Sequence, residues 1–368
     1  MFIKEIESEL ILRPLSDVIG IVERKQPLPI LSNVLIQKNQ GTLRVSATDL
    51  EIQISTQKQI FLEDSSHEEI TVSAKKLQEI LRVIPGKSKT SFDISDGKLV
   101  IKANKSRFVL QTLPAQDFPL IPIQLDNPSI FTIKSGAFKS LLALVQYAMA
   151  QQDIRYYLNG ILLVTSGMEI KAIATDGHRL AYASATFDQE FGNNEVILSR
   201  KTVNELFKLL DSSDESVSIE LSPKQVRFSF SDITLTTKVI DGKFPDYQRV
   251  IPNYSNHLLL DRVTVLQALQ RAAILSNEKF RGIRFVLTEK NLRIISSNSE
   301  QEEAQEDIET DYHGPALDIG FNVNYLLDGL NNTPSDKITF SFGDPNSSIL
   351  ITIPDRDDFK YVVMPMRI

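Results

Sequence analysis

The chain has 368 residues, of which 42% are hydrophobic and 24% charged, values that are typical of a folded globular protein. It contains no cysteine, so disulfides, thiolate catalysis and cysteine zinc sites are excluded. At roughly 150 residues per domain this length predicts two or three domains, and the net charge of −7 argues at first sight against a nucleic-acid partner.

The N-terminal segment is unlike a signal peptide. It reads MFIKEIESELILRPL, with acids where a signal peptide has a basic start and an uninterrupted apolar core. No apolar run approaches the roughly 20 residues that a membrane span requires. The four histidines are scattered without the spacing of metal ligands. We therefore expect a cytoplasmic protein with no membrane segment, no metal and no cofactor.

Three segments of the chain share one pattern of strands and turns. They span residues 28–55, 155–184 and 278–307, and each contains two alternating strands joined by a short polar turn. The first two segments then reach a Thr-Asp step and a third strand, whereas the third copy is more acidic at that point. Internal repeats of this kind indicate several copies of one structural unit.

A second shared pattern follows each of these segments. Residues 68–84, 194–210 and 316–330 each run from a strand into a short amphipathic helix, and further alternating strands come next. An additional helix is predicted before each first hairpin, in ELILRPLSDVIGIVERK, KSGAFKSLLALVQYAMA and DRVTVLQALQRAAILS. Each copy therefore reads as strand, helix and three strands, twice over.

Two linkers rich in proline and turn formers, residues 119–129 and 250–258, separate the copies. We predict an α+β fold with three tandem domains at residues 1–126, 127–252 and 253–368. Antiparallel α+β folds can share similar spacings of strands and turns by chance. The matching order of helices, strands, turns and linkers over three copies argues against coincidence.

The predicted helices differ in charge from the rest of the chain. The six helices hold thirteen Lys or Arg residues and seven Asp or Glu residues, whereas the remainder holds 27 and 40. If all helices share one face of the molecule, that face is basic and attracts phosphates without reading base sequence. Ordinary solvated helix faces would carry the same charges, so this pattern alone leaves a nucleic-acid partner open.

No local motif establishes a catalytic site. The string ATDGHRLA places Asp176 two residues before His178, and such a pair can act as a general base. No nucleophile signature stands nearby, however, and Asp-Gly is an ordinary turn former. The string PGKSKT has the Gly-Lys-Ser of a phosphate-binding loop, but Leu81 stands where that loop requires a glycine. A hydrolase that uses Asp176 and His178 is the enzymatic alternative to a non-catalytic protein.

Five strings occur in order along the chain: QQDIRYYLNG, ATDGHRLA, DGKFPDYQRVIP, AAILSNEKFRG and the C-terminal YVVMPMRI. Together they closely resemble the bacterial DNA polymerase III beta subunit family, the sliding clamps, and the resemblance covers the whole chain. It implies three tandem clamp domains, with antiparallel sheets outside and two helices each inside, that close into a six-domain ring as a head-to-tail homodimer.

The same resemblance implies a non-catalytic function. Such a ring encircles duplex DNA without sequence specificity and confers processivity on the replicative polymerase. The implied partners are double-stranded DNA, a second copy of the chain, the DNA polymerase III catalytic subunit, the clamp loader and other proteins with clamp-binding motifs. A monomeric repeat scaffold that binds only proteins is the alternative from a different class.

The resemblance also implies a peptide-binding pocket between the second and third domains. Its expected residues are Leu158, Thr175, Gly177, His178, Arg179, Leu180, Pro245, Arg249, Val250, Val362, Met364, Pro365 and Met366. Flexible, polarizable methionines suit a surface that accepts several peptides. Two positions depart from the family: Ile368, where Leu is common, and Asn346, in a pocket-edge loop where an apolar residue is frequent.

Further residues are implied for DNA and for the contact between protomers. The expected DNA-binding residues are Arg13, Arg24, Lys25, Gln152, Tyr156, Tyr157 and Lys201. Lys25 stands where arginine is common in the family, which keeps the charge and loses the fork geometry. At the protomer contact, Phe108 and Leu110 of the first domain are expected to meet Ile274 and Leu275 of the third.

Overall fold

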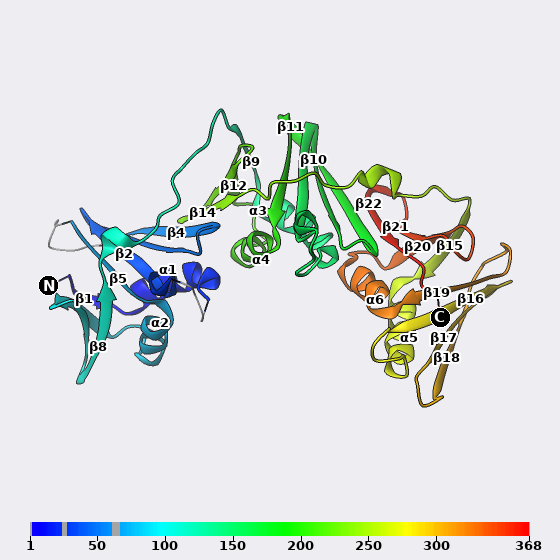
Figure 1. Cartoon of the computed structure of the whole chain (residues 1–368), viewed down its shortest axis with the longest axis horizontal. Helices are drawn as coiled ribbons and strands as arrows, with labels where there is room; N and C mark the ends of the chain where they lie inside the picture. Colours follow the sequence, from blue (N-terminus) through cyan, green and yellow to red (C-terminus); the bar gives the residue numbers. More distant parts are fainter. Residues whose placement is uncertain (1, 24–27, 61–66, 368) are drawn as a thin grey trace. The chain divides into compact units, whose positions relative to one another are not determined.

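The computed structural model describes residues 2–23, 28–60 and 67–367 (Figure 1). The chain divides into two compact units. The N-terminal unit comprises Met1–Gly136 and Asn204–Val239, and the C-terminal unit comprises Ala137–Val203 and Ile240–Ile368. The boundary between these units falls inside the predicted middle domain.

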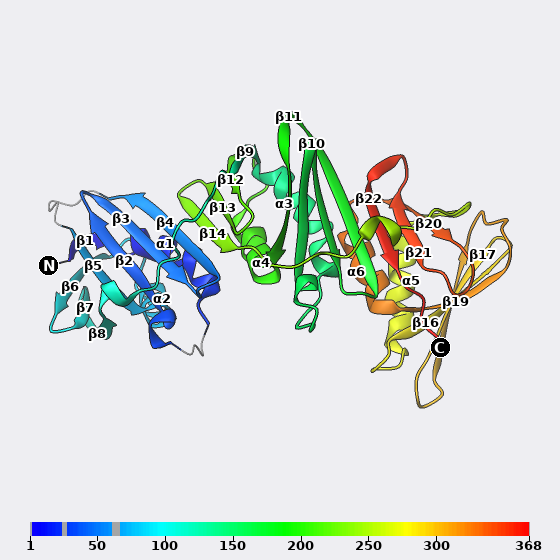
Figure 2. The same ribbon diagram turned by 45° about the horizontal axis from the view of Figure 1, so that its top comes forward.

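In the N-terminal unit, the described residues form one antiparallel sheet of twelve strands (Figure 2). Its order is β1-β6-β7-β8-β5-β2-β3-β4-β14-β13-β12-β9. The strands are β1 (Ile3–Glu7), β2 (Asn33–Asn39), β3 (Thr42–Thr48), β4 (Ile52–Gln59), β5 (Glu68–Ser73), β6 (Lys89–Ser95), β7 (Lys98–Ala103), β8 (Ser106–Leu113), β9 (Ser129–Lys134), β12 (Ser216–Leu221), β13 (Gln225–Phe230) and β14 (Ile233–Lys238).

This sheet joins the first repeat to the second. Strands β1 to β8 belong to the first repeat, and β9 with β12 to β14 belongs to the second. The junction is the antiparallel pair β4 and β14, in register from Ile52 with Thr237 to Thr56 with Ile233. Main-chain hydrogen bonds therefore continue from one repeat into the next.

Helices α1 (Glu9–Val18) and α2 (Ala74–Val83) cover the part of the sheet formed by the first repeat. Helix α1 packs against α2 and on β3 and β4, and α2 packs on β2 and β5. Ile11, Leu15 and Val18 recur at helical spacing in α1, and all three are buried. Burial of this apolar stripe leaves Glu9 and Arg13 exposed, whereas Asp17 is half-buried.

The C-terminal unit contains two antiparallel sheets in the described residues, a six-stranded sheet in the order β10-β11-β22-β21-β20-β15 and a four-stranded sheet in the order β18-β17-β16-β19. Their strands are β10 (Gly160–Thr175), β11 (Arg179–Ser199), β15 (Asn256–Asp261), β16 (Gly282–Thr288), β17 (Asn291–Ser297), β18 (Glu303–Glu309), β19 (Leu317–Asn322), β20 (Lys337–Phe342), β21 (Ile349–Ile353) and β22 (Arg356–Val363). The C-terminal strand β22 pairs with β11 of the second repeat, from Arg179 with Val363 to Ala183 with Phe359.

The remaining helices complete the repeat pattern. They are α3 (Ser135–Ala143), α4 (Arg200–Leu209), α5 (Arg262–Ile274) and α6 (Val323–Asn332), with short 3₁₀ turns η1 (Ile19–Ile21), η2 (Pro29–Ser32), η3 (Ala115–Asp117), η4 (Gln146–Ala148), η5 (Tyr156–Leu158) and η6 (Tyr247–Arg249). Asp261 caps α5 by accepting from the Thr264 N–H at 2.8 Å, and Asn322 caps α6 in the same way. In the described residues each predicted domain thus contains two α-helices, which confirms the α+β class.

No helix within the ranges 2–23, 28–60 and 67–367 has the length and apolar character needed to cross a membrane.

The start of β10 requires a glycine because the neighbouring strand passes very close. A Cβ built on Gly160 would lie 2.2 Å from the backbone oxygen of Leu198. We expect Gly160→Ala to lower the free energy of unfolding by about 3 kcal/mol, the upper end for overpacking, because a backbone atom must move. Urea denaturation measures the change. Gly86→Ala is the control, since its Cβ would meet only the flexible side chain of Glu9; an equal loss in both variants would contradict this reading.

Candidate functional site

An apolar cluster lies where the second and third repeats meet within the C-terminal unit. Its buried members are Ala150, Leu158, Leu162, Ile173, Leu180, Ile197, Phe244, Leu350 and Val362. Three of them form a row across adjacent strands, because Val362 of β22 is in register with Leu180 of β11 and with Leu350 of β21. Side chains opposite each other in antiparallel strands pack closely, so this row is a rigid apolar base.

Exposed apolar side chains stand next to this buried cluster. Val362 is fully buried, and Met364 two residues later is 44% exposed. Val250 is 41% exposed and follows η6, whose Tyr247 packs against the cluster. Arg249 is largely exposed and pairs with Asp246 at 2.9 Å. Exposed apolar groups beside a buried apolar base, with a charged rim, are typical of protein-interaction surfaces.

The turn between β10 and β11 is held by Asp176. One carboxylate oxygen accepts the backbone N–H groups of His178 at 2.9 Å and Arg179 at 3.1 Å, and the other accepts Nε of Arg179 at 3.0 Å. Gly177 adopts φ +90°, a left-handed conformation that favours glycine. The backbone N–H of Met364 donates to the carbonyl of His178 at 2.9 Å, which ties the C-terminal segment to this turn.

The structure therefore brings most of the expected peptide-binding residues together. Leu158, Leu180 and Val362 belong to the cluster, and Thr175 is buried where β10 ends. The other positions lie in the turn after Thr175, in the segment around η6, or just beyond β22. Ile368 lies outside the described residues. Asn346 is exposed in the loop between β20 and β21, where its N–H donates to Asp344 at 2.8 Å.

Asp176 and His178 do not form the hydrogen-bonded pair of a general base. Both carboxylate oxygens of Asp176 accept from the turn and from Arg179, as described above. The His178 ring instead stacks on Tyr325, with ring centroids 6.3 Å apart and an angle of 18° between the planes. The geometry of this turn is that of a structural element and gives the hydrolase alternative no support.

Three of the expected DNA-binding residues lie in one well-braced loop. Gln152 is exposed, Tyr156 is 57% exposed, and Tyr157 contacts the Tyr156 ring edge-on at 5.9 Å. The side chain of Asn159 brackets the loop, donating to the carbonyl of Asp153 at 2.9 Å and accepting its N–H at 3.0 Å. Tyr157 also packs against the apolar cluster, so Tyr156 is the freer ring for a stacking contact.

The other DNA-binding positions are spread along the chain. Lys201 lies in the first turn of α4, and Arg13 is exposed on α1. Arg24 and Lys25 lie outside the described residues. Hydrogen bonds from Arg155 lower the pKa of Asp153 to about 2, so this carboxylate stays ionised and paired inside the loop.

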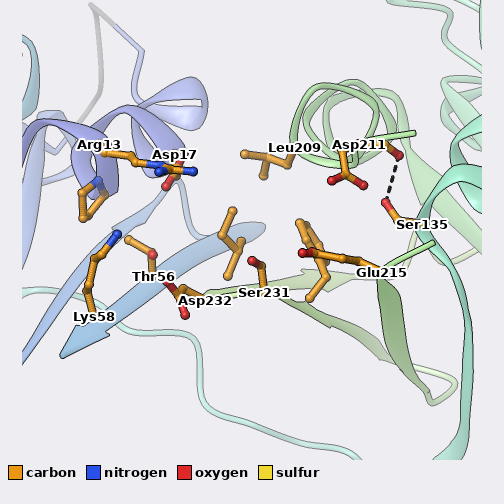
Figure 3. Close-up of a pocket in the computed structure, with 13 residues that line it drawn as sticks. Arg13, Asp17, Thr56, Lys58, Ser135, Leu209, Asp211, Glu215, Ser231 and Asp232 are labelled. Atoms are coloured by element: carbon orange, nitrogen blue, oxygen red, sulfur yellow. Dashed lines mark hydrogen bonds between the residues drawn. The ribbon is translucent and has the colours of Figure 1, made fainter. Parts of the chain in front are cut away.

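Arg13 borders a cavity of about 450 Å³ in the N-terminal unit (Figure 3). Its lining combines two bases, Arg13 and Lys58, with the acids Asp17, Asp211, Glu215 and Asp232. Figure 3 shows the Arg13 side chain reaching toward Asp17 and Lys58 standing between α1 and the strands. Burial raises the pKa of Asp17. The positive charges of Arg13 and Lys58 lower this pKa, and the negative charge of Asp232 raises it further, but burial has the largest effect. The positive charge of Arg13 is therefore partly offset by a nearby acid.

The expected protomer-contact residues differ in exposure: Leu110 is buried in its own unit, Phe108 and Leu275 are half-buried, and Ile274 is exposed. All six residues of β7, Lys98–Ala103, pair with β8. On the other side of β8, only Thr112 and Leu113 pair with β5. The stretch that carries Phe108 and Leu110 thus has one edge without a strand partner in the described residues. Ile274 at the end of α5 is 77% exposed, and Leu275 follows it half-buried.

Comparisons with known proteins match this three-part architecture. Family models of the DNA polymerase III beta subunit match residues 1–122 as the N-terminal domain, 132–246 as the central domain and 248–367 as the C-terminal domain. The chain is 44% identical over 368 residues to the beta sliding clamp of Pseudomonas putida and 39% identical over 366 residues to that of Escherichia coli K12, each covering 99% of both chains.

Solved structures show the same likeness. The DNA polymerase III subunit beta of Pseudomonas aeruginosa superimposes with a TM-score of 0.93 at 42% identity, covering 99% of this chain and 100% of that one. A clamp from the same organism, bound to griselimycin, gives 0.92 at 43% identity and covers 99% of each chain. The fold is that of a three-domain DNA clamp. The chain belongs to the DNA polymerase III beta subunit family, which confirms the resemblance found in its sequence.

Two acids of the Arg13 cavity, Asp17 and Asp211, are predicted to affect the free energy of unfolding at pH 7 in opposite directions. A pKa raised by folding means that the stability contributed by Asp17 is present at low pH and is lost as the pH rises through the folded-state pKa. We therefore expect Asp17→Asn to raise the free energy of unfolding at pH 7, by less than about 1 kcal/mol after solvent screening.

Asp211 in the same cavity is the control. Hydrogen bonds from Ser213 lower its pKa, so its contribution is present at neutral pH and is lost as the pH falls through the folded-state pKa. Asp211→Asn should therefore lower stability at pH 7. Urea denaturation at pH 7 and near pH 4 tests both signs, and destabilisation by Asp17→Asn at pH 7 would contradict the assignment.

Proposed function

We propose that this chain is a DNA sliding clamp, an accessory subunit that encloses duplex DNA and tethers the replicative polymerase to it. The observation that carries the proposal is the threefold repeat of one α+β unit, matched end to end by three consecutive domains of the beta subunit family. The protein performs no chemistry in this role. Processivity comes from keeping the polymerase near its template.

Two copies of the chain close the ring in this proposal, with domains at residues 1–126, 127–252 and 253–368 contributed by each. The partly unpaired edge of β8 and the exposed Ile274 support a head-to-tail contact, with Phe108 and Leu110 of one copy against Ile274 and Leu275 of the other. Pairing an open edge strand removes an aggregation hazard. A head-to-tail contact closes when its rotation fits the ring.

Contacts with DNA are weak and independent of base sequence. The proposed residues are Arg13, Arg24, Lys25, Gln152, Tyr156, Tyr157 and Lys201. The exposed guanidinium of Arg13 attracts DNA phosphates, and the exposed ring of Tyr156 can stack on a base. Partial neutralisation of Arg13 by Asp17 keeps its attraction modest, which suits a protein that must move along its track. The proposed location is the cytoplasm, where a clamp loader opens and installs the ring.

Partner proteins dock on the apolar cluster and its exposed rim. The thirteen expected positions are proposed as the binding surface for short hydrophobic motifs of the DNA polymerase III catalytic subunit and other clamp-binding proteins. A buried row through Leu180 and Val362 supplies a firm base, and Met364 supplies an adaptable rim. A few apolar anchors in such a site carry most of the affinity.

We expect Met364→Ala to weaken binding of a clamp-motif peptide about tenfold and to reduce stimulation of the polymerase in primer extension. Met168→Ala is a matched control, because Met168 is 45% exposed on β10 and lies outside the cluster. Arg249→Ala should also weaken peptide binding, because it removes a charge from the rim of the surface.

The assembled ring should survive all three substitutions. Light scattering is expected to give a mass near twice the 41.4 kDa of one chain for wild type and variants alike. Equal stimulation by the Met364 and Met168 variants would remove the docking assignment, and a single-chain mass for the wild type would favour a monomeric scaffold.

A further inference from the structure

Arg179 stands among the peptide-surface residues in sequence, but its side chain leaves the strand on the other face. Successive side chains of a strand point to opposite faces. Leu180 faces the apolar cluster together with Val362, its partner on β22. The groups that contact the Arg179 guanidinium lie outside that cluster, as strand alternation requires.

The guanidinium of Arg179 is bound by three separate segments. Nε donates to Asp176 in the preceding turn at 3.0 Å, Nη1 donates to Asp328 of α6 at 2.5 Å, and Nη2 donates to the carbonyl of Tyr147 at 2.6 Å. Its central carbon lies 4.6 Å from the centre of the Tyr325 ring, a cation–π contact. The Arg179 side chain is only 10% exposed, so this charge is largely removed from solvent.

These contacts connect the central and C-terminal family domains behind the peptide surface. Asp176 and Tyr147 belong to the segment matched as the central domain, and Asp328 belongs to the C-terminal one. Arg179, Tyr325 and Asp328 also line a cavity of about 510 Å³ on this side of β11. The turn that they hold is the one whose His178 carbonyl accepts the Met364 N–H.

The turn is thus fixed from two sides. On one side the Arg179 bridge fastens it to α6, where the Tyr325 ring also stacks on His178. On the other side the hydrogen bond between Met364 and His178 fastens it to the segment after β22. A shift of the turn relative to α6 would therefore move the attached Met364 as well.

We propose that Arg179 contributes to the peptide surface as a positioning residue, whose guanidinium makes no contact with the peptide. Its bridge to Asp328 sets the distance between the turn and α6, and through it the place of Met364. This inference rests on the proposed peptide-binding function. It assigns to Asp328, which lies on a helix outside the expected site, a role in peptide affinity.

The test compares two aspartates that each pair with an arginine. Asp328 is 44% exposed and bound to Arg179, and Asp318 is 48% exposed and bound to Arg284 on the other sheet. Griselimycin, the ligand in one related clamp structure, serves as the probe in calorimetric titration of the full-length protein. We expect Asp328→Asn to weaken binding about tenfold, Asp328→Glu to restore most of it, and Asp318→Asn to leave it unchanged.

The opposite result identifies a direct contact. If Arg179 touches the ligand itself, Asp328→Asn releases the guanidinium, and binding stays equal or becomes tighter. That outcome would overturn the positioning role. Equal losses in the Asp328 and Asp318 variants would overturn it as well, because the effect would then follow from losing any ion pair.

A second readout is independent of ligand binding. The chain has five methionines, so methyl-labelled methionine gives a simple NMR spectrum. Asp328→Asn should shift the Met364 and Met366 methyl signals and leave Met168 in place, and unchanged Met364 and Met366 signals would overturn the inference. If the wild type fails to bind griselimycin while these shifts occur, the docking proposal fails and the positioning role stands.

Discussion

Main-chain pairing between successive repeats is the interaction on which the rest of this structure depends. Strand β4 pairs with β14 at the first junction, and β11 pairs with β22 at the second. Each junction consists of five register pairs of antiparallel backbone, so adjacent repeats share one hydrogen-bonded sheet. Backbone hydrogen bonds require no particular side chains, which allows the repeats to diverge in sequence while the joints persist. In the proposed ring, the partly unpaired stretch of β8 is where the same interaction would join a second copy.

The second junction also creates the candidate docking surface. Pairing of β11 with β22 brings Leu180 and Val362 side by side on one face and leaves Arg179 on the other. One joint therefore provides the apolar base of the candidate docking surface and, behind it, an ion pair from the buried Arg179 to Asp328 of α6. Because the Arg179 guanidinium is poorly solvated, losing one of its two carboxylate partners costs more than losing a surface ion pair. The strength of the joint and the shape of the surface are thus set by the same few residues.

The distribution of charge reconciles an acidic protein with a DNA partner. A net charge of −7 coexists with a surplus of bases on the helices, as the sequence pattern indicates. Several of those helix cations have partners within the chain: Arg271 pairs with Glu306, Lys208 pairs with Glu205, and Arg262 donates to one carbonyl in the last turn of α6 and to one just beyond it. The attraction available to phosphates is correspondingly weaker than a count of bases suggests. Weak attraction is compatible with movement only when something other than adhesion retains the protein, and in the proposed ring enclosure supplies that retention.

The sequence predicted most of the repeated elements because their signals are local, but the two strands expected in residues 155–184 form the single strand β10 (Gly160–Thr175). The alternation of apolar and polar residues that predicts β3 involves only neighbouring residues, as does the helical spacing of apolar residues in α1. The structure contains both elements. The resemblance also placed Arg179 among the expected peptide-binding residues. The direction of its side chain was not, because Asp328, the partner that binds it, lies 149 residues away. The surroundings of Asp17 have the same origin, since Asp232, which lines the same cavity, comes from a distant segment next to the β4–β14 pairing. Pairing between distant segments leaves no pattern in a single sequence.

The central claim is that enclosure holds this protein on DNA, and retention on circular and linear duplexes tests it most directly. The clamp loader installs the labelled protein on a nicked circle, gel filtration at high salt separates bound from free protein, and half of the sample is cut once with a restriction enzyme. Salt screens phosphate contacts but leaves a topological link intact. The account predicts that the protein stays with the uncut circle and leaves the cut one. Equal retention on both DNAs, or equal loss from both as salt rises, would contradict it.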